Sequence, residues 1–194
     1  MNVFSNLLKE AKLFHETHDA LRLFIEFPLE IKLQQIKPHF IPAANLMLGD
    51  KGLDLCYYKS FRDAIIDAAP YVIWRETYKD TNIGSDFMDK FACYEVIGKD
   101  APFTCSSMRS FILYQPANFY YPWHHHPAEE IYIVLAGEAE FFLEGDSSKI
   151  LKSGDFAFHP ANYSHALKTL DQPILAYVVW RSDFDIPPVW SLNS

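Results

Sequence analysis

The sequence predicts a mainly β fold, in which an antiparallel sandwich or barrel follows a mostly helical extension. Three observations support this. Apolar residues of the first half recur at helical spacing, those from about residue 104 onward alternate with a period of two, and turn residues separate the alternating runs. No polar or glycine-rich linker divides the halves. We therefore expect one integrated unit, with residues 1–98 packed on the barrel and residues 99–194 forming it.

Composition narrows the class of protein. The 194 residues are 49% hydrophobic and 16% aromatic, which indicates a folded chain, and their net charge of −8 argues against binding to nucleic acid. No apolar run reaches 18 residues, so no membrane span is expected. The N-terminus lacks the pattern of a signal peptide, and three cysteines without CxxC spacing are typical of reduced thiols. These features predict a cytoplasmic protein.

The elements of the first half follow from apolar spacing and from helix starts. One helix is indicated near the N-terminus by Val3, Leu7, Leu8, Ala11 and Phe14. Apolar residues 21–27 continue the helical pattern. Ser60, with the acidic Asp63 three residues later, resembles a helix N-cap. Ser85 is a similar candidate N-cap, at the start of a short stretch that ends near residue 98.

The second half contains six runs with strand character, rich in Phe, Ile, Val and Tyr. They are residues 108–115, 130–136, 138–143, 155–159, 164–169 and 174–180. Asn, Gly, Asp, Ser and Pro lie between them, as expected for turns. Many short strands without intervening helices predict an antiparallel sandwich or barrel.

A histidine cluster is the main functional signal. Five of the eight histidines lie within residues 124–165. His124, His126, Glu130 and Tyr132 share strand parity, so their side chains are expected to converge on one face. Imidazole and carboxylate donors suit Zn²⁺, Fe²⁺, Mn²⁺, Co²⁺ or Ni²⁺. The alternative is a solvated loop of histidines and surface glutamates.

Two neighbours of these residues are expected to face away from the site. His125 alternates with the two histidines beside it, and Glu129 alternates with Glu130. We therefore predict that neither binds metal. The same holds for His15, His18, His39 and the three cysteines, which lie in the helical half or outside the motif spacing.

Two ordered motifs resemble those of the cupin superfamily. The first, G-x5-HxH-x3,4-E-x6-G, is matched by Asn118, His124, His126, Glu130 and Gly137. The second, G-x5-PxG-xx-H-x3-N, is matched by Gly154, Pro160, Asn162, His165 and Thr169. Asn replaces Gly at positions 118 and 162, and Asn tolerates a positive φ. The resemblance covers about residues 104–182 and implies a cupin double-stranded β-helix, a jelly-roll barrel.

A narrower resemblance is to the cupin dimethylsulfoniopropionate lyases. It rests on the HxHxxxExY arrangement, the long helical first half and the ending LAYVVWRSDFDIPPVWS. Carried over from that family, the ligands of one divalent metal ion fall on His126, Glu130, Tyr132 and His165, and the residues of the substrate pocket on Tyr121, His124 and Trp180. The implied activity is that of a carbon–sulfur lyase, which cleaves dimethylsulfoniopropionate to dimethyl sulfide and acrylate.

The residues suit this β-elimination. The reaction removes a proton α to a carboxylate and expels a neutral sulfide. Tyr132, two residues beyond Glu130, is our candidate for ligand at rest and base during turnover, because a nearby cation favours a phenolate. Its alternative role is that of a core tyrosine. The sulfonium requires an aromatic face, for which Tyr121 and Trp180 are better placed than Tyr120 and Trp123.

Two other functions remain open from sequence. An Fe²⁺-dependent cupin dioxygenase acting on a small organic acid would use His124, His126, Glu130 and His165 as ligands. A non-catalytic cupin would bind a small ligand without turnover. In each case we expect a small molecule, not nucleic acid or membrane, as the partner, and a homodimer is compatible with the sequence.

Overall fold

The computed structural model describes residues 2–54 and 56–191. Its helices are α1 (Val3–Thr17), α2 (Asp19–Phe24), α3 (Pro42–Gly49), the 3-10 helix η1 (Lys51–Asp54), α4 (Lys59–Ala68) and α5 (Ser85–Met88). Its strands are β1 (Lys32–Leu33), β2 (Ala92–Ile97), β3 (Phe103–Thr104), β4 (Arg109–Gln115), β5 (Tyr120–His125), β6 (Glu129–Leu143), β7 (Lys149–Lys152), β8 (Phe156–His159), β9 (His165–Arg181) and β10 (Val189–Trp190). Among these residues, no helix has the length and apolar character needed to cross a bilayer.

The strands form one curved sheet, mostly antiparallel, that folds into the expected cupin barrel. Neighbouring strands follow the order β1-β3-β2-β4-β9-β5-β10, and β6 pairs with β7, β8 and β9. The two long strands β6 and β9 pair along nearly their whole length. Each long strand also serves two partners in turn: the first part of β9 pairs with β5 and its last part with β4.

Turn geometry at three motif positions explains how the chain bends. The register of β6 against β9 shifts on both sides of Gly137, which has φ 75°, and a Cβ there would lie 1.7 Å from the Pro173 carbonyl oxygen. Asn118 and Asn162 have φ values of 57° and 63°. The expectation that Asn can replace glycine at these two positions is therefore confirmed.

Alternate residues of the central strands supply two different cores. On β9, Tyr177 and Val179 belong to the core beneath the helices, whereas Val178 and Trp180 belong to the core inside the barrel. The same division applies to β2, β4 and the first part of β6. A sheet covered on both faces can hold apolar residues at every position. One consequence is that polar side chains inside the barrel stand out as functional candidates.

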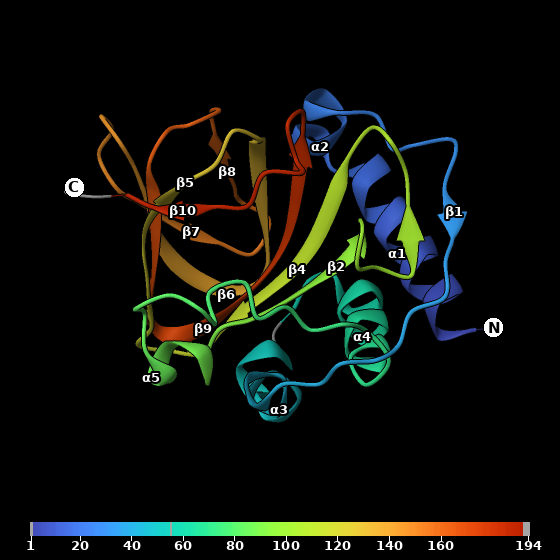
Figure 1. Cartoon of the computed structure of the whole chain (residues 1–194), viewed down its shortest axis with the longest axis horizontal. Coiled ribbons are helices and arrows are strands. Elements are labelled where there is room, and N and C mark those ends of the chain that lie inside the picture. Colours follow the sequence, from blue (N-terminus) through green and yellow to red (C-terminus); the bar gives the residue numbers. More distant parts are fainter. Residues whose placement is uncertain (1, 55, 192–194) are drawn as a thin grey trace.

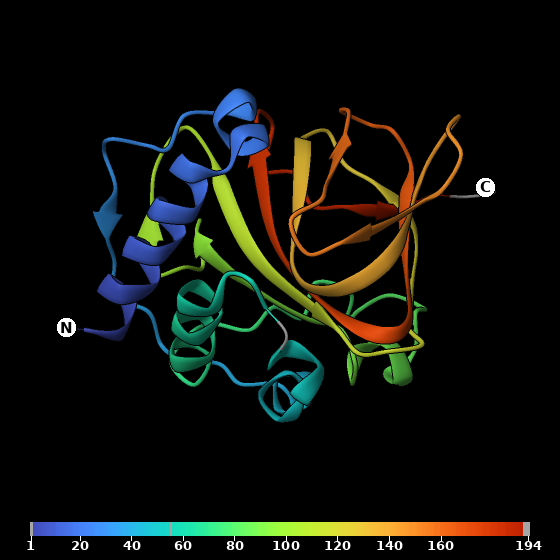
Figure 2. The same ribbon diagram turned by 180° about the vertical axis from the view of Figure 1, so that it is seen from behind.

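The helices form a layer on the outer face of this sheet. In Figures 1 and 2, α1 and α4 lie beside each other against β2 and β4, while β5, β7 and β8 lie at the other end of the molecule. Helix α1 buries Leu7, Ala11 and Phe14 at helical spacing, and Asn2 caps it by accepting a hydrogen bond from the Phe4 amide. The mainly β fold with a mostly helical first half is thus as predicted.

Several local predictions need correction. Ser60 lies inside α4, whose N-cap is Tyr58. The stretch that begins at Ser85 is helical only through Met88 and continues as strand β2, which is buried on both faces. Two pairs of expected strands are single strands bent by bulges, β6 and β9. Strands β1, β3, β5, β7 and β10 lie outside the six predicted runs, and Pro122 inside β5 masks its pattern.

The division at residue 98 stays a prediction. Strands β1 and β2 precede it and yet belong to the same sheet as the barrel strands.

Candidate metal centre and active-site pocket

Strand register brings the histidines and Glu130 together inside the barrel. Glu130 of β6 lies opposite His159 of β8 on one side and opposite Trp180 of β9 on the other. The pairing of β5 with the start of β9 places His124 opposite His165. Residues from four strands therefore meet at one point, although they are up to 56 positions apart in the chain.

Three buried side chains form a group that could hold a metal ion, called here the metal-binding group. One donor atom from each of His126, Glu130 and His165 lies within 4.8 Å of the others. The Nε2 atom of His126 is 3.5 Å from Glu130 Oε1, and Nε2 of His165 is 3.2 Å from Glu130 Oε2. All three residues are 2% exposed. Two imidazoles and one carboxylate are a donor set that suits divalent transition metals.

The backbone fixes how the histidine rings present their nitrogens. The Nδ1 atoms bond to backbone carbonyls, as seen for His124 with Pro122 (2.8 Å), His126 with Ala128 (2.9 Å) and His165 with Tyr163 (3.0 Å). A carbonyl only accepts, so Nδ1 carries the proton and Nε2 has a free lone pair. Nε2 of His126 and of His165 is buried without a hydrogen-bond partner among the described residues. Such orphaned acceptors fit a metal ion.

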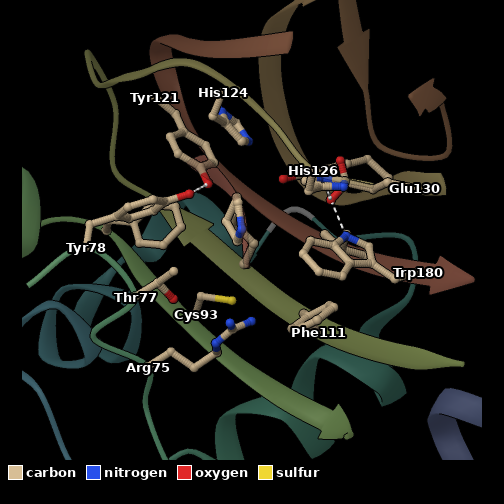
Figure 3. Close-up of a pocket in the computed structure, with 15 residues that line it drawn as sticks. Arg75, Thr77, Tyr78, Cys93, Phe111, Tyr121, His124, His126, Glu130 and Trp180 are labelled. Carbon is tan, nitrogen blue, oxygen red and sulfur yellow. Dashed lines mark hydrogen bonds and ion pairs between the residues drawn. The ribbon is translucent and has the colours of Figure 1, made fainter. Parts of the chain in front are cut away.

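Glu130 is held by one donor on each oxygen. The indole Nε1–H of Trp180 donates to Oε1 at 2.6 Å, and His159 Nδ1 donates to Oε2 at 2.7 Å (Figure 3 draws the Trp180 bond). Burial alone would raise the pKa of Glu130, but His126 and the donors around it hold that pKa well below its usual range. Burial lowers the pKa of His159 to about 4, so its ring is neutral near pH 7.

A pocket lies beside this group. It is lined by Arg75, Thr77, Tyr78, Phe91, Cys93, Phe111, Leu113, Tyr121, His124, His126, Glu130, Tyr132, Val178, Trp180 and Pro188. Figure 3 shows Tyr121 and His124 on one side, Glu130 and Trp180 on another, and Arg75 with Cys93 across from Tyr121. A small organic molecule can therefore contact aromatic, acidic and basic groups at once.

Three phenols face this pocket. The hydroxyls of Tyr78 and Tyr121 share a short hydrogen bond, and the Tyr121 ring stacks on His124 with centroids 4.0 Å apart. Burial raises the pKa values of Tyr78, Tyr121 and Tyr132, and the Glu130 carboxylate raises that of Tyr132 further. In the protein by itself these phenols therefore keep their protons.

The seven residues chosen from sequence all line this pocket or belong to the metal-binding group. They are Tyr121, His124, His126, Glu130, Tyr132, His165 and Trp180. Tyr132 is not one of the three grouped donors, so its place as a ligand stays a prediction. The His125 ring is turned elsewhere and its Nδ1 lies 3.0 Å from Ser191 Oγ. Tyr120 is 44% exposed, and Trp123 packs against Phe142 outside the pocket.

Sequence reasoning missed several residues of the site. His159 belongs to the histidine cluster, but its contact with Glu130 depends on the register of β6 and β8, which spacing does not reveal. Arg75 and Tyr78 come from an irregular segment between α4 and α5. Cys93 also reaches the pocket, where burial raises its thiol pKa to about 12 and keeps it neutral.

Comparison with known proteins points to one family. The family model for dimethylsulfoniopropionate lyases matches residues 44–176, more than half of the chain. The dimethylsulfoniopropionate lyase DddQ of Ruegeria pomeroyi is 45% identical over 186 residues, covering 96% of this chain and 92% of that protein.

Solved structures agree with the sequence comparison. The crystal structure of DddQ from Ruegeria pomeroyi superposes with a TM-score of 0.95 at 44% identity, covering 97% of this chain and 96% of that one. A structure from a study of the lyases RdDddP and RnDddQII gives a TM-score of 0.93 at 33% identity, with 98% of both chains covered.

Proposed function

The chain belongs to the dimethylsulfoniopropionate lyase family, and from this premise we propose that its buried histidine and glutamate site cleaves dimethylsulfoniopropionate. The reaction is a β-elimination that yields dimethyl sulfide and acrylate. The observation that carries the assignment to this site is the pair of unpartnered Nε2 atoms, on His126 and His165, beside the Glu130 carboxylate. The two alternatives, an Fe²⁺-dependent dioxygenase and a non-catalytic binding protein, do not explain why the chain matches the lyase family.

In this proposal His126, Glu130, His165 and Tyr132 hold one divalent metal ion per chain. Tyr132 lies two residues beyond Glu130 and lines the same pocket, which supports its place as the fourth ligand. Bound there, the ion supplies positive charge that lowers the pKa of the Tyr132 phenol and stabilises negative charge developing on the substrate. Zinc and iron are among the ions that suit these donors.

Tyr132 is the proposed base. Its Oη takes the proton from the carbon α to the carboxylate, the electron pair forms the double bond of acrylate, and the carbon–sulfur bond breaks with its electrons left on sulfur. Only the ionised phenol can do this, and burial opposes ionisation in the protein alone. The base is therefore expected to be active only in the metal-loaded enzyme.

The substrate's two ends need different surroundings. Tyr121, His124 and Trp180 are the proposed substrate-binding residues, and the ring face of Tyr121 suits the sulfonium. Trp180 has a second duty in this proposal, because its indole N–H holds Glu130. A cytoplasmic location belongs to the same proposal and is supported by the three free cysteines, Cys56, Cys93 and Cys105.

The test is Tyr132→Phe with Tyr120→Phe as the matched control. Tyr120 is a half-exposed neighbour outside the pocket. Headspace dimethyl sulfide and metal content are measured for both variants. Removing the base is expected to lower kcat by about 10² to 10⁴-fold while the fold and most of the metal remain, and the control should match the wild type. Normal release of dimethyl sulfide by a metal-loaded Tyr132→Phe protein would refute Tyr132 as the base.

A further inference from the structure

Arg75 is a basic residue fixed at the wall of the pocket and not used in the mechanism above. Its backbone N–H donates to the Cys93 carbonyl at 2.8 Å, and the adjacent Trp74 forms an antiparallel bridge with Tyr94 of β2. These bonds tie the segment before Tyr78 to the sheet. In Figure 3 the guanidinium extends into the pocket between Cys93 and Phe111, on the side away from Tyr121.

The guanidinium of Arg75 is enclosed but has unused donors. Its side chain is 20% exposed, and its carbon lies 5.0 Å from the centroid of the Phe111 ring. Among the described residues, the one carboxylate within 4 Å is that of Glu95, whose Oε1 is 3.7 Å from Arg75 Nη1. That distance is too long for a hydrogen bond. A guanidinium has five N–H donors in a plane that matches a carboxylate.

Arg75 is not the sole cation near Glu95, because Arg109 lies close to the same carboxylate oxygen. The same Oε1 atom lies 3.8 Å from Arg109 Nη1, and Oε2 accepts the Asp100 amide at 3.0 Å. One buried carboxylate is therefore shared by two arginines. Arg109 has a further carboxylate partner, Asp185, at 2.6 Å, whereas among the described residues no second carboxylate lies within 4 Å of Arg75, which faces the pocket. Part of the positive charge of Arg75 is left to attract an anion there.

We propose that the Arg75 guanidinium binds the carboxylate of the substrate and thereby sets its orientation. The inference rests on the proposed function, since the carboxylate is that of dimethylsulfoniopropionate. Its sulfonium is repelled by Arg75 and is directed to the opposite side, where Figure 3 shows the Tyr121 ring. The product acrylate keeps the same group, so short monocarboxylates are expected to compete for Arg75.

Arg109 provides a matched control. Both arginines lie near Glu95 Oε1 and each lies over a phenylalanine ring, Phe111 for Arg75 and Phe184 for Arg109. Arg109 does not line the pocket. The variants Arg75→Gln and Arg109→Gln thus remove the same charge from the surroundings of Glu95, and only the first removes it from the pocket.

The main experiment compares kcat/KM for dimethylsulfoniopropionate with kcat/KM for its carboxamide analogue, in which a neutral amide replaces the carboxylate. Arg75→Gln is expected to reduce the preference for the acid by about 10- to 100-fold, with most of the change in KM, because hydrogen bonds to charged groups are the strong ones. Arg109→Gln should leave the preference within about twofold. An equal loss on both substrates would mean that Arg75 is structural and would overturn the proposal.

A second measurement does not depend on turnover. Propionate binding is measured by calorimetry in metal-free wild-type, Arg75→Gln and Arg109→Gln proteins. Metal-free protein is used so that a metal ion does not contribute to the binding of the carboxylate. Loss of binding only in Arg75→Gln supports the proposal, and equal binding in all three overturns it. Should Arg75→Gln fail to fold, Arg75→Lys is used instead. Lysine keeps the charge but loses one of the two hydrogen bonds that a guanidinium gives a carboxylate, so its KM is expected to rise by up to about tenfold.

These outcomes separate the two hypotheses. A wild-type protein that binds propionate through Arg75 but releases no dimethyl sulfide contradicts the proposed function and keeps the carboxylate site. A wild-type protein that releases dimethyl sulfide, with the acid preference unchanged in Arg75→Gln, contradicts the carboxylate site and keeps the function.

Discussion

Replacing Trp180 with Phe tests whether this side chain serves the metal centre as well as the substrate. The change keeps an aromatic ring and removes the indole N–H that donates to Glu130 Oε1 at 2.6 Å. Glu130 is 2% exposed, so water does not replace the lost donor. A hydrogen bond to a charged group contributes about 1.5–3 kcal/mol, which corresponds to about 10- to 150-fold in an equilibrium constant.

The expected result for Trp180→Phe is a metal affinity lower by about 10- to 100-fold, the usual effect of losing a residue that orients a ligand. The dissociation constant is measured by competition with a chelator of known affinity. Trp123→Phe is the control, because Trp123 packs on Phe142 outside the pocket. An unchanged metal dissociation constant with a raised KM would refute this reasoning and leave Trp180 a residue for the substrate alone.

Two further predictions concern His159, which contacts Glu130, and Cys93, which lines the pocket. Burial holds the His159 pKa at about 4, below the 6.5 of an unfolded histidine, so the unfolded chain binds more protons between these two pH values. The stability of the metal-free protein should therefore fall as the pH drops from about 6.5 toward 4. In thermal melts, the melting temperature of His159→Gln should fall less steeply than that of the wild type over the same pH range. Burial raises the Cys93 pKa to about 12, so at pH 8 its thiol should resist iodoacetamide in the folded protein, whereas rapid labelling of Cys93 in peptide maps would contradict this.

Local geometry explains which parts of the site the sequence revealed. Glu130 and Tyr132 share a face because strands have a period of two, and this holds whatever the rest of the fold is. Asn118 and Asn162 have the positive φ expected of glycine substitutes. Such features depend on a few neighbouring residues, so the strand period predicts the shared face, and the resemblance to the cupin motifs predicts the two Asn turns.

Contacts between distant strands explain what the sequence did not reveal. His159 meets Glu130 because β8 pairs with β6 in one particular register, and a shift by one residue would turn its ring out of the barrel. Arg75 reaches the pocket through bonds between irregular backbone and β2. Strand β2 itself was read as helical because both of its faces are buried, which removes the alternation that marks a strand.

The charges around the pocket suit a substrate that has no net charge but two charged ends. Glu130 and an ionised Tyr132 would carry two negative charges, which one divalent cation balances, while Glu95 offsets part of the charge of Arg75. A site balanced in this way does not select a ligand by the ligand's net charge. Selection then depends on where the charges lie. With Arg75 on one side and the Tyr121 ring on the other, a zwitterion fits in one direction, and that direction is set before the base acts.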